Sequence, residues 1–359
     1  MKVYNKTFLC TNYNNSFNYL ICDYKKYVKL NSKQVLEKGI IMEELFQHIQ
    51  DIINLPEFIM GYCTFLPEYI RQAIIDSIKF VPFLYFLYFA IELLERFFLK
   101  NIELFTKLIQ KLGALFGIVI SIVPECGYQV IASTFYARRM ISRGTLLAFF
   151  IMCSDDALPL LFMDFSKAYY IIPALMIKAI VAFVVAYGFN FISFIRHRGN
   201  KTTEKINSIN TDINVKGCCY HNMMTIEHPP YWYMHPFTHT VNIFIYTMVT
   251  LSFIYGGIQT YGAENLASML LINSPLQVVA VAVIGGLSNC VVSILIALAF
   301  VKGLISFPAF VAGLISITGM GIYTLTKQNV NKQEISVISS ALLVISVIAG
   351  LIVYYSFGI

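Results

Sequence analysis

The chain has 359 residues, of which 57% are hydrophobic and only 13% are charged, and its mean hydropathy is +0.67. Soluble domains carry about 25% charged residues, so this composition excludes an ordinary soluble globule. The formal net charge is +6. We expect the lipid bilayer to be the main partner of the chain, and we predict no nucleic-acid partner.

Residues 1–75 form an amino-terminal extension ahead of the first apolar span. The first 20 residues are polar and rich in Asn and Tyr, so we expect no cleavable signal peptide. A stretch near 41–55 is amphipathic, which is typical of helices that lie on a membrane surface.

Six later segments are apolar over about the 20 residues that a membrane-spanning helix needs. They predict full-length helical spans at 76–98, 144–165, 170–195, 236–258, 305–325 and 334–357. Between these spans lie two pairs of shorter apolar segments, which are 109–123 with 127–140 and 272–287 with 290–302. The sequence therefore predicts an all-α integral membrane protein.

Each short pair bends at a polar tip, at 124–127 in the first pair and at 288–290 in the second. The first tip contains proline, which lacks a backbone donor, and glycine, which relaxes a helix, so it leaves peptide groups unpaired. Within a bilayer such groups need protein or water around them. Two interpretations stay open: re-entrant hairpins, or pairs of thin crossings that would give ten spans.

The membrane region contains an internal repeat. Residues 113–162 align without a gap on 277–326 at an offset of 164, which pairs Cys126 with Cys290. Whether the short pairs are re-entrant hairpins or complete crossings, each copy crosses the membrane an odd number of times. The two copies are therefore predicted to lie in opposite orientations, a pattern typical of secondary transporters.

These patterns divide the chain into four parts. The amino-terminal extension is followed by repeat 1 at 76–196, a linker at 197–235 that contains Cys and His, and repeat 2 at 236–359. We predict two inverted repeats of about five helical elements each, with broken or re-entrant helix pairs.

Basic residues gather on one side of this predicted topology. They are Lys107, Lys111, Arg138, Arg139, Arg143, Arg196, Arg198, Lys201, Lys327 and Lys332. The connection at 259–271 lies on the opposite side and contains no Lys or Arg. Because basic loops mark the cytoplasmic side, the linker is predicted to be cytoplasmic in a multi-pass protein of the cell membrane. Lys302 and the basic residues of the amino-terminal segment do not follow this rule.

Acidic residues at membrane depth are the most informative polar residues. Glu125 lies at the first tip, and Ser154, Asp155 and Asp156 lie halfway along the span at 144–165. A carboxylate at the bilayer centre costs at least about 2.5 kcal/mol on insertion scales, so these three acids need a partner. A bound cation or a proton is one interpretation, and an internal ion pair, with Lys178 as the candidate, or a helix-end cap is the other.

The second copy offers polar but uncharged groups at the same positions. Asn289 stands opposite Glu125, and Thr318-Gly319-Met320 stands opposite the Ser-Asp-Asp run. This asymmetry favours a single cation site between unequal halves. A thiol at each tip would suit a soft metal ion, although cysteine is also a common small packing residue. The predicted substrate or ion path comprises Glu125, Cys126, Ser154, Asp155, Asp156, Ser288, Asn289 and Cys290.

The linker carries a second cluster, because five of the six histidines fall within 197–239. Its spacing differs from that of a structural zinc finger, and a Cys/His-rich tract in a loop is typical of metal capture. The alternative is a polar loop with chance Cys and His, in which His239 anchors a helix end. The candidate ligands are Cys218, Cys219, His221, His228, His235 and His239.

Several of these runs together resemble a known family. They are 123–130, 136–139, 144–146, 154–156, 288–290, 303–307 and 312–314, with 218–221 and 239–240 near the linker. Over roughly 76–359 the chain resembles the ten-span heavy-metal exporters, whose members carry names such as arsenic-efflux protein or manganese transporter. It differs from the family pattern at Glu125, where the family has glutamine, at 287–288, where the family has Ile-Pro, and in a sparser linker cluster.

The residues and the resemblance together predict a secondary-active transporter, with export of a heavy-metal or divalent metal ion through a site between the repeats. The metal is substrate, so we predict no cofactor, and a homo-oligomer is compatible with the sequence. No Gly-x-x-x-x-Gly-Lys-Ser/Thr loop is present, which argues against ATP hydrolysis.

Two alternatives stay open. The first is a transporter of an organic solute or an anion, in which amide dipoles at the tips replace ligands. The second is an intramembrane enzyme that uses Asp155 and Asp156 as an acid/base pair. Adjacent residues on a helix point about 100° apart, so the two carboxylates would not face each other, and we predict that the chain is not an enzyme.

Overall fold

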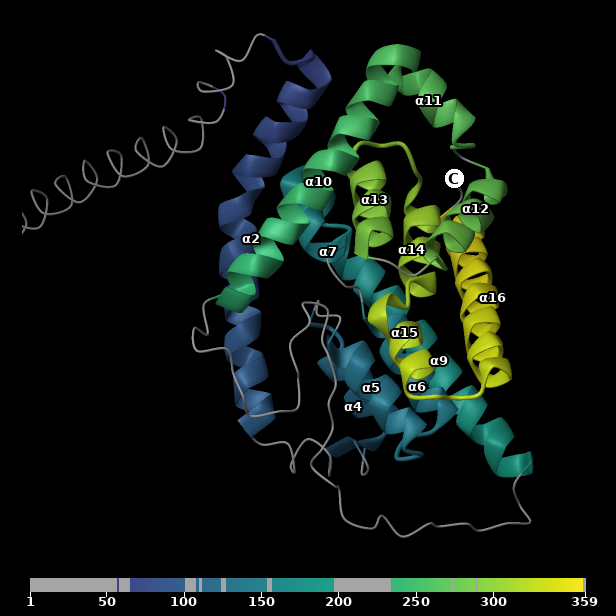
Figure 1. Cartoon of the computed structure of the whole chain (residues 1–359). Helices are drawn as coiled ribbons and strands as arrows, with labels where there is room; N and C mark the ends of the chain where they lie inside the picture. Colours follow the sequence, from purple (N-terminus) through teal and green to yellow (C-terminus); the bar gives the residue numbers. More distant parts are fainter. Residues whose placement is uncertain are drawn as a thin grey trace, which may run out of the picture. The chain divides into compact units, whose positions relative to one another are not determined.

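The computed structural model describes residues 57, 65–100, 108–109, 112–123, 127–153, 157–196, 234–272, 274–287 and 290–357. Contacts divide the chain into Met1–Tyr62 and Cys63–Ile359, and all described residues except Glu57 belong to the second unit. The regular elements of this described part are helices (Figure 1). Six of its helical segments are long and apolar enough to cross a membrane, so the chain has the pattern of a multi-pass membrane protein.

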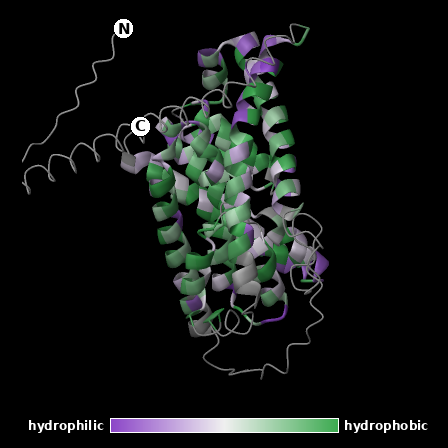
Figure 2. Ribbon diagram, turned by 90° about the vertical axis from the view of Figure 1, so that its left-hand side faces the viewer, coloured by the Kyte–Doolittle hydropathy of each residue, from purple (hydrophilic) through white to green (hydrophobic). Residues whose placement is uncertain are grey.

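Four of the six predicted spans are continuous helices. They are α2 (Glu68–Lys100), α9 (Ile171–Arg196), α10 (Met234–Tyr261) and α16 (Lys332–Phe357). Apolar residues dominate along these helices (Figure 2), and many of them face outward, as Ile180, Phe253 and Ile352 do. Outward apolar side chains suit a lipid environment, because lipid tails replace a protein core as their solvent.

The predicted spans at 144–165 and 305–325 are both present among the six segments long and apolar enough to cross a membrane, but each is interrupted near its middle. The first divides into α6 (Arg143–Met152), α7 (Ala157–Leu160) and the short 3-10 helix η1 (Leu161–Met163). The second divides into α14 (Phe307–Ser316) and α15 (Gly319–Lys327).

Local chemistry explains both interruptions. Cys153 and Ile317 leave the helical conformation with ψ values of 134° and 120°, so each helix stops at an extended residue. Pro159 cannot donate to the carbonyl four residues earlier, and its ring crowds that carbonyl, which disfavours a helix through Asp155. In the second copy Gly319 and Gly321 follow the interruption, and glycine weakens a helix by about 1 kcal/mol relative to alanine.

The two short apolar pairs form half-length helices. They are α4 (Ala114–Ile120) with α5 (Gly127–Ala137), and α12 (Pro275–Gly285) with α13 (Cys290–Val301). At 1.5 Å per residue a 12-residue helix is about 18 Å long, whereas a bilayer core is about 30 Å thick. Each of these helices, taken alone, is shorter than the core of a bilayer.

The helix bounds recur at the offset of 164. Adding 164 to the bounds of α6 gives the bounds of α14. The turn after α5 also recurs after α13, since Arg139 and Gly303 both have positive φ, at 60° and 73°. The same backbone bond closes each turn, from Met140 N to Phe135 O at 2.9 Å and from Leu304 N to Ala299 O at 2.8 Å.

Corresponding long helices run in opposite directions. Helix α2 begins at the upper end of Figure 1, whereas α10, which packs along it, ends there. Likewise α9 ends at the lower end, whereas α16 starts at the lower end and finishes near the carboxyl terminus at the upper end (Figure 1). The connections from α5 to α6 and from α15 to α16 lie at the lower end, which we call the basic end because it carries Arg138, Arg139, Arg143, Lys327 and Lys332.

Close backbone packing around the second hairpin gives the first testable prediction. A methyl group at Gly285 would lie 2.2 Å from Ser316 Oγ and 2.6 Å from the Gly313 carbonyl oxygen, whereas a methyl group at Gly188 would meet nothing within 4 Å. Overpacking of this kind costs about 1–3 kcal/mol. Gly285→Ala should therefore lower the thermal midpoint of the detergent-solubilised protein, and Gly188→Ala should leave it unchanged. Equal midpoints would show that α12 and α14 can separate at no cost.

Candidate functional site

A half-length helix of each repeat packs against the broken span of the other repeat. Helix α5 of the first hairpin packs against α15, and helix α13 of the second hairpin packs against α7. Each hairpin therefore contacts the second half of the broken span that belongs to the other repeat. The candidate spans that contain the two interruptions are also the most deeply buried, since 87% and 76% of their apolar windows lie inside the protein.

The predicted path residues fall at the two tips and at the first interruption. Glu125, Cys126, Ser154, Asp155, Asp156, Ser288 and Asn289 lie outside the described residues, and Cys290 is described only as the first residue of α13. The described flanking residues locate the path: Val123 and Gly127 border the first tip, and Cys153 and Ala157 border the first interruption.

Lys178 in α9 is the one predicted ion-pair partner that the structure describes in full. Its side chain is fully buried, and its Nζ donates a hydrogen bond of 2.8 Å to the carbonyl oxygen of Cys153. Cys153 directly precedes the Ser-Asp-Asp run, so the ammonium lies at the first interruption. The offset of 164 places the buried Leu342 at the equivalent position of the second repeat, so the first half of the site alone carries this buried charge.

Two buried polar residues of the first hairpin escaped the sequence analysis. The Gln129 amide in α5 and the Ser121 hydroxyl at the end of α4 are fully buried, and neither has a hydrogen-bond partner among the described residues. One turn further along α5, Ser133 Oγ donates to the Gly321 carbonyl oxygen of α15 at 2.9 Å. Residues four apart share a helix face, so Gln129 lies on the face of α5 that packs on α15. Only the proximity of these residues to the predicted tip could have indicated them.

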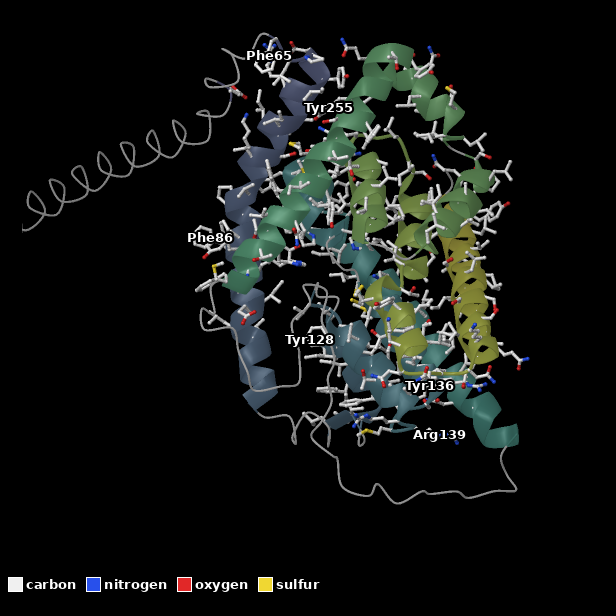
Figure 3. All side chains as sticks on the ribbon, in the orientation of Figure 1. Phe65, Phe86, Tyr128, Tyr136, Arg139 and Tyr255 are labelled. Atoms are coloured by element: carbon white, nitrogen blue, oxygen red, sulfur yellow. The ribbon has the colours of Figure 1, made fainter. Side chains whose placement is uncertain are left out.

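A polar cluster joins the two repeats at the basic end. Arg143 donates to Glu334 Oε1 from Nε at 3.0 Å and from Nη2 at 2.6 Å, and it also donates to the Tyr136 hydroxyl at 3.1 Å. The Tyr136 hydroxyl in turn donates to Glu334. Tyr136 is labelled near the lower end of Figure 3. We call Tyr136, Arg143 and Glu334 the polar cluster, which links α5 and α6 to α16.

The residues 164 positions away form an aromatic cluster at the opposite end. Tyr136, Arg143 and Glu334 correspond to Phe300, Phe307 and Tyr170. The Tyr170 ring lies 5.3 Å from the Phe300 ring and 5.0 Å from the Phe307 ring, between centroids. This aromatic cluster links α13 and α14 to the start of α9. Equivalent positions of the two copies therefore make equivalent contacts with different chemistry.

Charged residues line a crevice of about 430 Å³ near the aromatic cluster. Its lining includes Asp76, Asp164 and Lys302. Lys302 Nζ lies 3.5 Å from Asp76 Oδ2, and the Tyr255 hydroxyl donates to Asp76. Hydrogen bonds from Ser166 lower the pKa of Asp164 below its ordinary value. Asp76 and Tyr255 belong to α2 and α10, so a second polar contact joins the repeats at this end.

Most of the predicted linker ligands lie outside the described residues. Cys218, Cys219, His221 and His228 lie outside the described residues, and His235 is described only as part of the α10 backbone. The buried His239 ring packs edge-on against Tyr88 of α2, with 4.4 Å between centroids. Within the described part of the chain no three His, Cys, Asp or Glu side chains come together as metal ligands.

Comparisons of the chain with protein-family models, with curated proteins and with solved structures found no match. The case for function therefore depends on the site itself.

Proposed function

We propose that the chain is a secondary-active transporter built from two inverted repeats of about five helical elements each. Three observations support the inversion: the helix bounds that recur at an offset of 164, the opposite directions of α2 and α10, and those of α9 and α16 (Figure 1). The observation that carries the proposal is the matched pair of interruptions after Met152 and Ser316, inside the most buried spans. Broken helices at membrane depth are tolerated where they are covered by protein or line a water-filled cavity.

The cargo that this site fits best is a divalent metal cation. Three predicted path acids, Glu125, Asp155 and Asp156, and the buried ammonium of Lys178 belong to one region of the first repeat. Three carboxylates and one ammonium leave two formal negative charges, which a divalent cation would neutralise. Cys126, Asn289 and Cys290 add thiol and amide ligands from the two tips. The direction is export, by analogy with the heavy-metal exporters that the sequence resembles.

A transporter of this kind needs no catalytic residues and no resident cofactor. Protons or the membrane potential would drive alternating access between the two faces. With the basic end on the cytoplasmic side, the first hairpin enters from the cytoplasm, and the 197–235 linker is cytoplasmic. The Cys and His residues of that linker would then deliver metal to the transporter.

The first test uses resistance to metal. In a host that lacks its own exporters, the wild-type chain should raise the tolerated concentration of at least one divalent or soft metal. Asp155→Asn and Asp156→Asn should each reduce that resistance at least tenfold while the protein is still made, because each removes one of the charges that hold the cation. Asp164→Asn is the matched control, since this carboxylate caps the start of the short helix α8 (Phe165–Ala168). Full resistance in both path variants would exclude the carboxylate site.

One observation favours a second candidate. The fully buried Lys178 ammonium would also suit a carboxylate or another anion, so the alternative is a transporter of an organic solute or anion. Uptake of such a solute, together with wild-type protein that retains no metal after purification, would support this alternative.

A further inference from the structure

A crevice of about 310 Å³ lies between α12, α14, α15 and α16. Half of its described lining residues carry hydroxyl groups, and the described lining includes no ionisable side chain. The hydroxyl residues are Ser316, Thr318, Ser336, Ser339 and Ser340, and the others are Val283, Gly286, Leu287, Ile322 and Leu343.

The crevice extends from the second interruption toward the basic end. At its inner end Ser316 and Thr318 flank Ile317, where the helix is interrupted, and Leu287 is the last described residue before the second tip. At its outer end Ser336 and Ser340 lie near the start of α16, which follows the connection at the basic end (Figure 1). Helix α15, which has 9 residues, runs between the inner and the outer end of the crevice. At 1.5 Å per residue it is about 13 Å long, which is nearly half the thickness of a bilayer core of about 30 Å.

Four of the five hydroxyl positions are apolar in the first repeat, and the fifth, Thr318, corresponds to Ser154. Subtracting 164 from Ser336, Ser339 and Ser340 gives Ile172, Leu175 and Met176, and subtracting it from Ser316 gives Met152. Ile172 and Met176 are exposed, by 70% and 60%. Duplication therefore supplied two related surfaces, of which one faces outward with apolar side chains and the other carries hydroxyls. Since a hydroxyl in hydrocarbon loses its partners in water, the polar copy is better suited to contact with water.

The hydrogen bonds of the lining favour a cation over an anion. Ser316 Oγ donates to the Gly313 carbonyl oxygen at 2.9 Å, and Ser340 Oγ donates to the Val337 carbonyl oxygen at 3.1 Å. A hydroxyl that donates its single hydrogen keeps two lone pairs as acceptors. The oxygens of Ser316 and Ser340 can therefore replace water molecules around a cation, and neither of these two hydroxyls has a hydrogen left for an anion.

We propose that this crevice is the half-channel through which a partly hydrated cation travels between the basic end of the molecule and the second interruption. The proposal rests on the transport function proposed above and adds its route. Neutral oxygen ligands bind a cation weakly enough for it to leave again, so the hydroxyls conduct the ion and the acids at the first interruption select it.

The test measures the reaction of introduced thiols with charged reagents. Ser339→Cys and Ser340→Cys, made in the full chain in sealed vesicles of both orientations, should react with a membrane-impermeant cationic methanethiosulfonate from the side of the basic end. Leu175→Cys and Met176→Cys, labelled from the opposite side, at which α9 begins, are the matched controls, because they occupy the equivalent positions of the apolar copy. We expect reaction at least tenfold faster at the crevice positions, measured above the background of the native cysteines of the wild-type chain. The cationic reagent should also react faster than an anionic one of similar size.

Two results would overturn the proposal. The first is a rate at Ser339→Cys and Ser340→Cys that equals the rate at Leu175→Cys and Met176→Cys. The second is rapid reaction at 340 that leaves metal efflux unchanged, since a bulky adduct in the route must block the ion. Wild-type chain that moves no metal would instead refute the proposed function, and the labelling rates would still report whether the crevice admits a cation.

Discussion

Lys178→Met is expected to reduce the yield of folded protein strongly and to abolish transport. The ammonium is fully buried and donates at 2.8 Å to the carbonyl oxygen of Cys153. Loss of that donor leaves the buried carbonyl with one hydrogen bond fewer, which lowers the free energy of unfolding by about 1–3 kcal/mol. If the same ammonium neutralises an acid of the Ser-Asp-Asp run, the loss rises to about 3–5 kcal/mol, because a buried charge is left uncompensated. The monodisperse fraction in detergent and the thermal midpoint measure this effect.

Combining Lys178→Met with a second substitution identifies the acid that pairs with Lys178. Lys178→Met combined with Asp155→Asn or with Asp156→Asn keeps the formal charge of the region unchanged. We expect one of these double variants to recover the yield that Lys178→Met loses, and that variant identifies the acid paired with the ammonium. Transport should stay lost in the other combination, because that combination removes the acid that holds the cargo. Lys178→Arg keeps the positive charge and changes the shape of the donor, so its yield shows whether the charge or the packing of Lys178 stabilises the protein.

Two double variants that are both as unstable as Lys178→Met would contradict the ion pair. The Cys153 carbonyl would then be the principal acceptor, and the three acids would be available to the cargo. The experiment therefore decides between the structural and the functional interpretation of the acids.

Apolar length predicted most of the fold. Four continuous spans begin and end within a few residues of their predicted bounds, except that α2 starts at Glu68 rather than at 76. Hydropathy also predicted the half-length pairs, because a polar tip divides each apolar run. It could not show that 144–165 and 305–325 are interrupted, since the residues around Cys153 and Ile317 stay apolar enough to keep the average high. Pro159 was the available local signal for the first interruption.

The site was harder to predict, because packing and not composition defines it. The sequence indicated Lys178 as a candidate partner of the acids, and the structure places its ammonium against Cys153. The hydroxyls of the crevice come from two separate segments, 316–318 and 336–340, and nothing in either segment alone marks a route. Gln129 is similar, because an amide on an apolar helix becomes informative only once its burial and its lack of partners are known.

Weakening the polar cluster and weakening the aromatic cluster should shift access to the site in opposite directions. The two clusters occupy equivalent positions at opposite ends of the molecule, so in the proposed transporter each would hold closed the end at which it lies. Glu334→Gln removes the charge that Arg143 contacts at 2.6 Å, and Phe307→Leu removes a ring that packs on Tyr170. Alternating access requires that only one end opens at a time, so loss of contacts at the basic end favours the state that is open there.

The expected shifts are modest because the contacts are partly exposed. The Arg143 side chain is 58% exposed and that of Glu334 is 29% exposed, and such ion pairs contribute about 0.2–1 kcal/mol. An aromatic pair contributes about 0.5–1.5 kcal/mol beyond its buried area. Since 1.4 kcal/mol is a factor of ten, Glu334→Gln should raise the reaction rate of Ser340→Cys by up to about fivefold, and Phe307→Leu should lower it by up to about tenfold.

A charge exchange separates this gating role from simple destabilisation. Arg143→Glu together with Glu334→Arg restores an ion pair between α6 and α16, so the rate at Ser340→Cys should return toward that of the otherwise unmodified chain. The thermal midpoints of Glu334→Gln and Phe307→Leu should both fall, because each loses native contacts, whereas the reaction rates should move apart. Rates that move in the same direction would mean that the clusters report only stability. Opposite shifts would show that duplication gave one transporter two closures of unequal chemistry, of which only the polar one responds to salt.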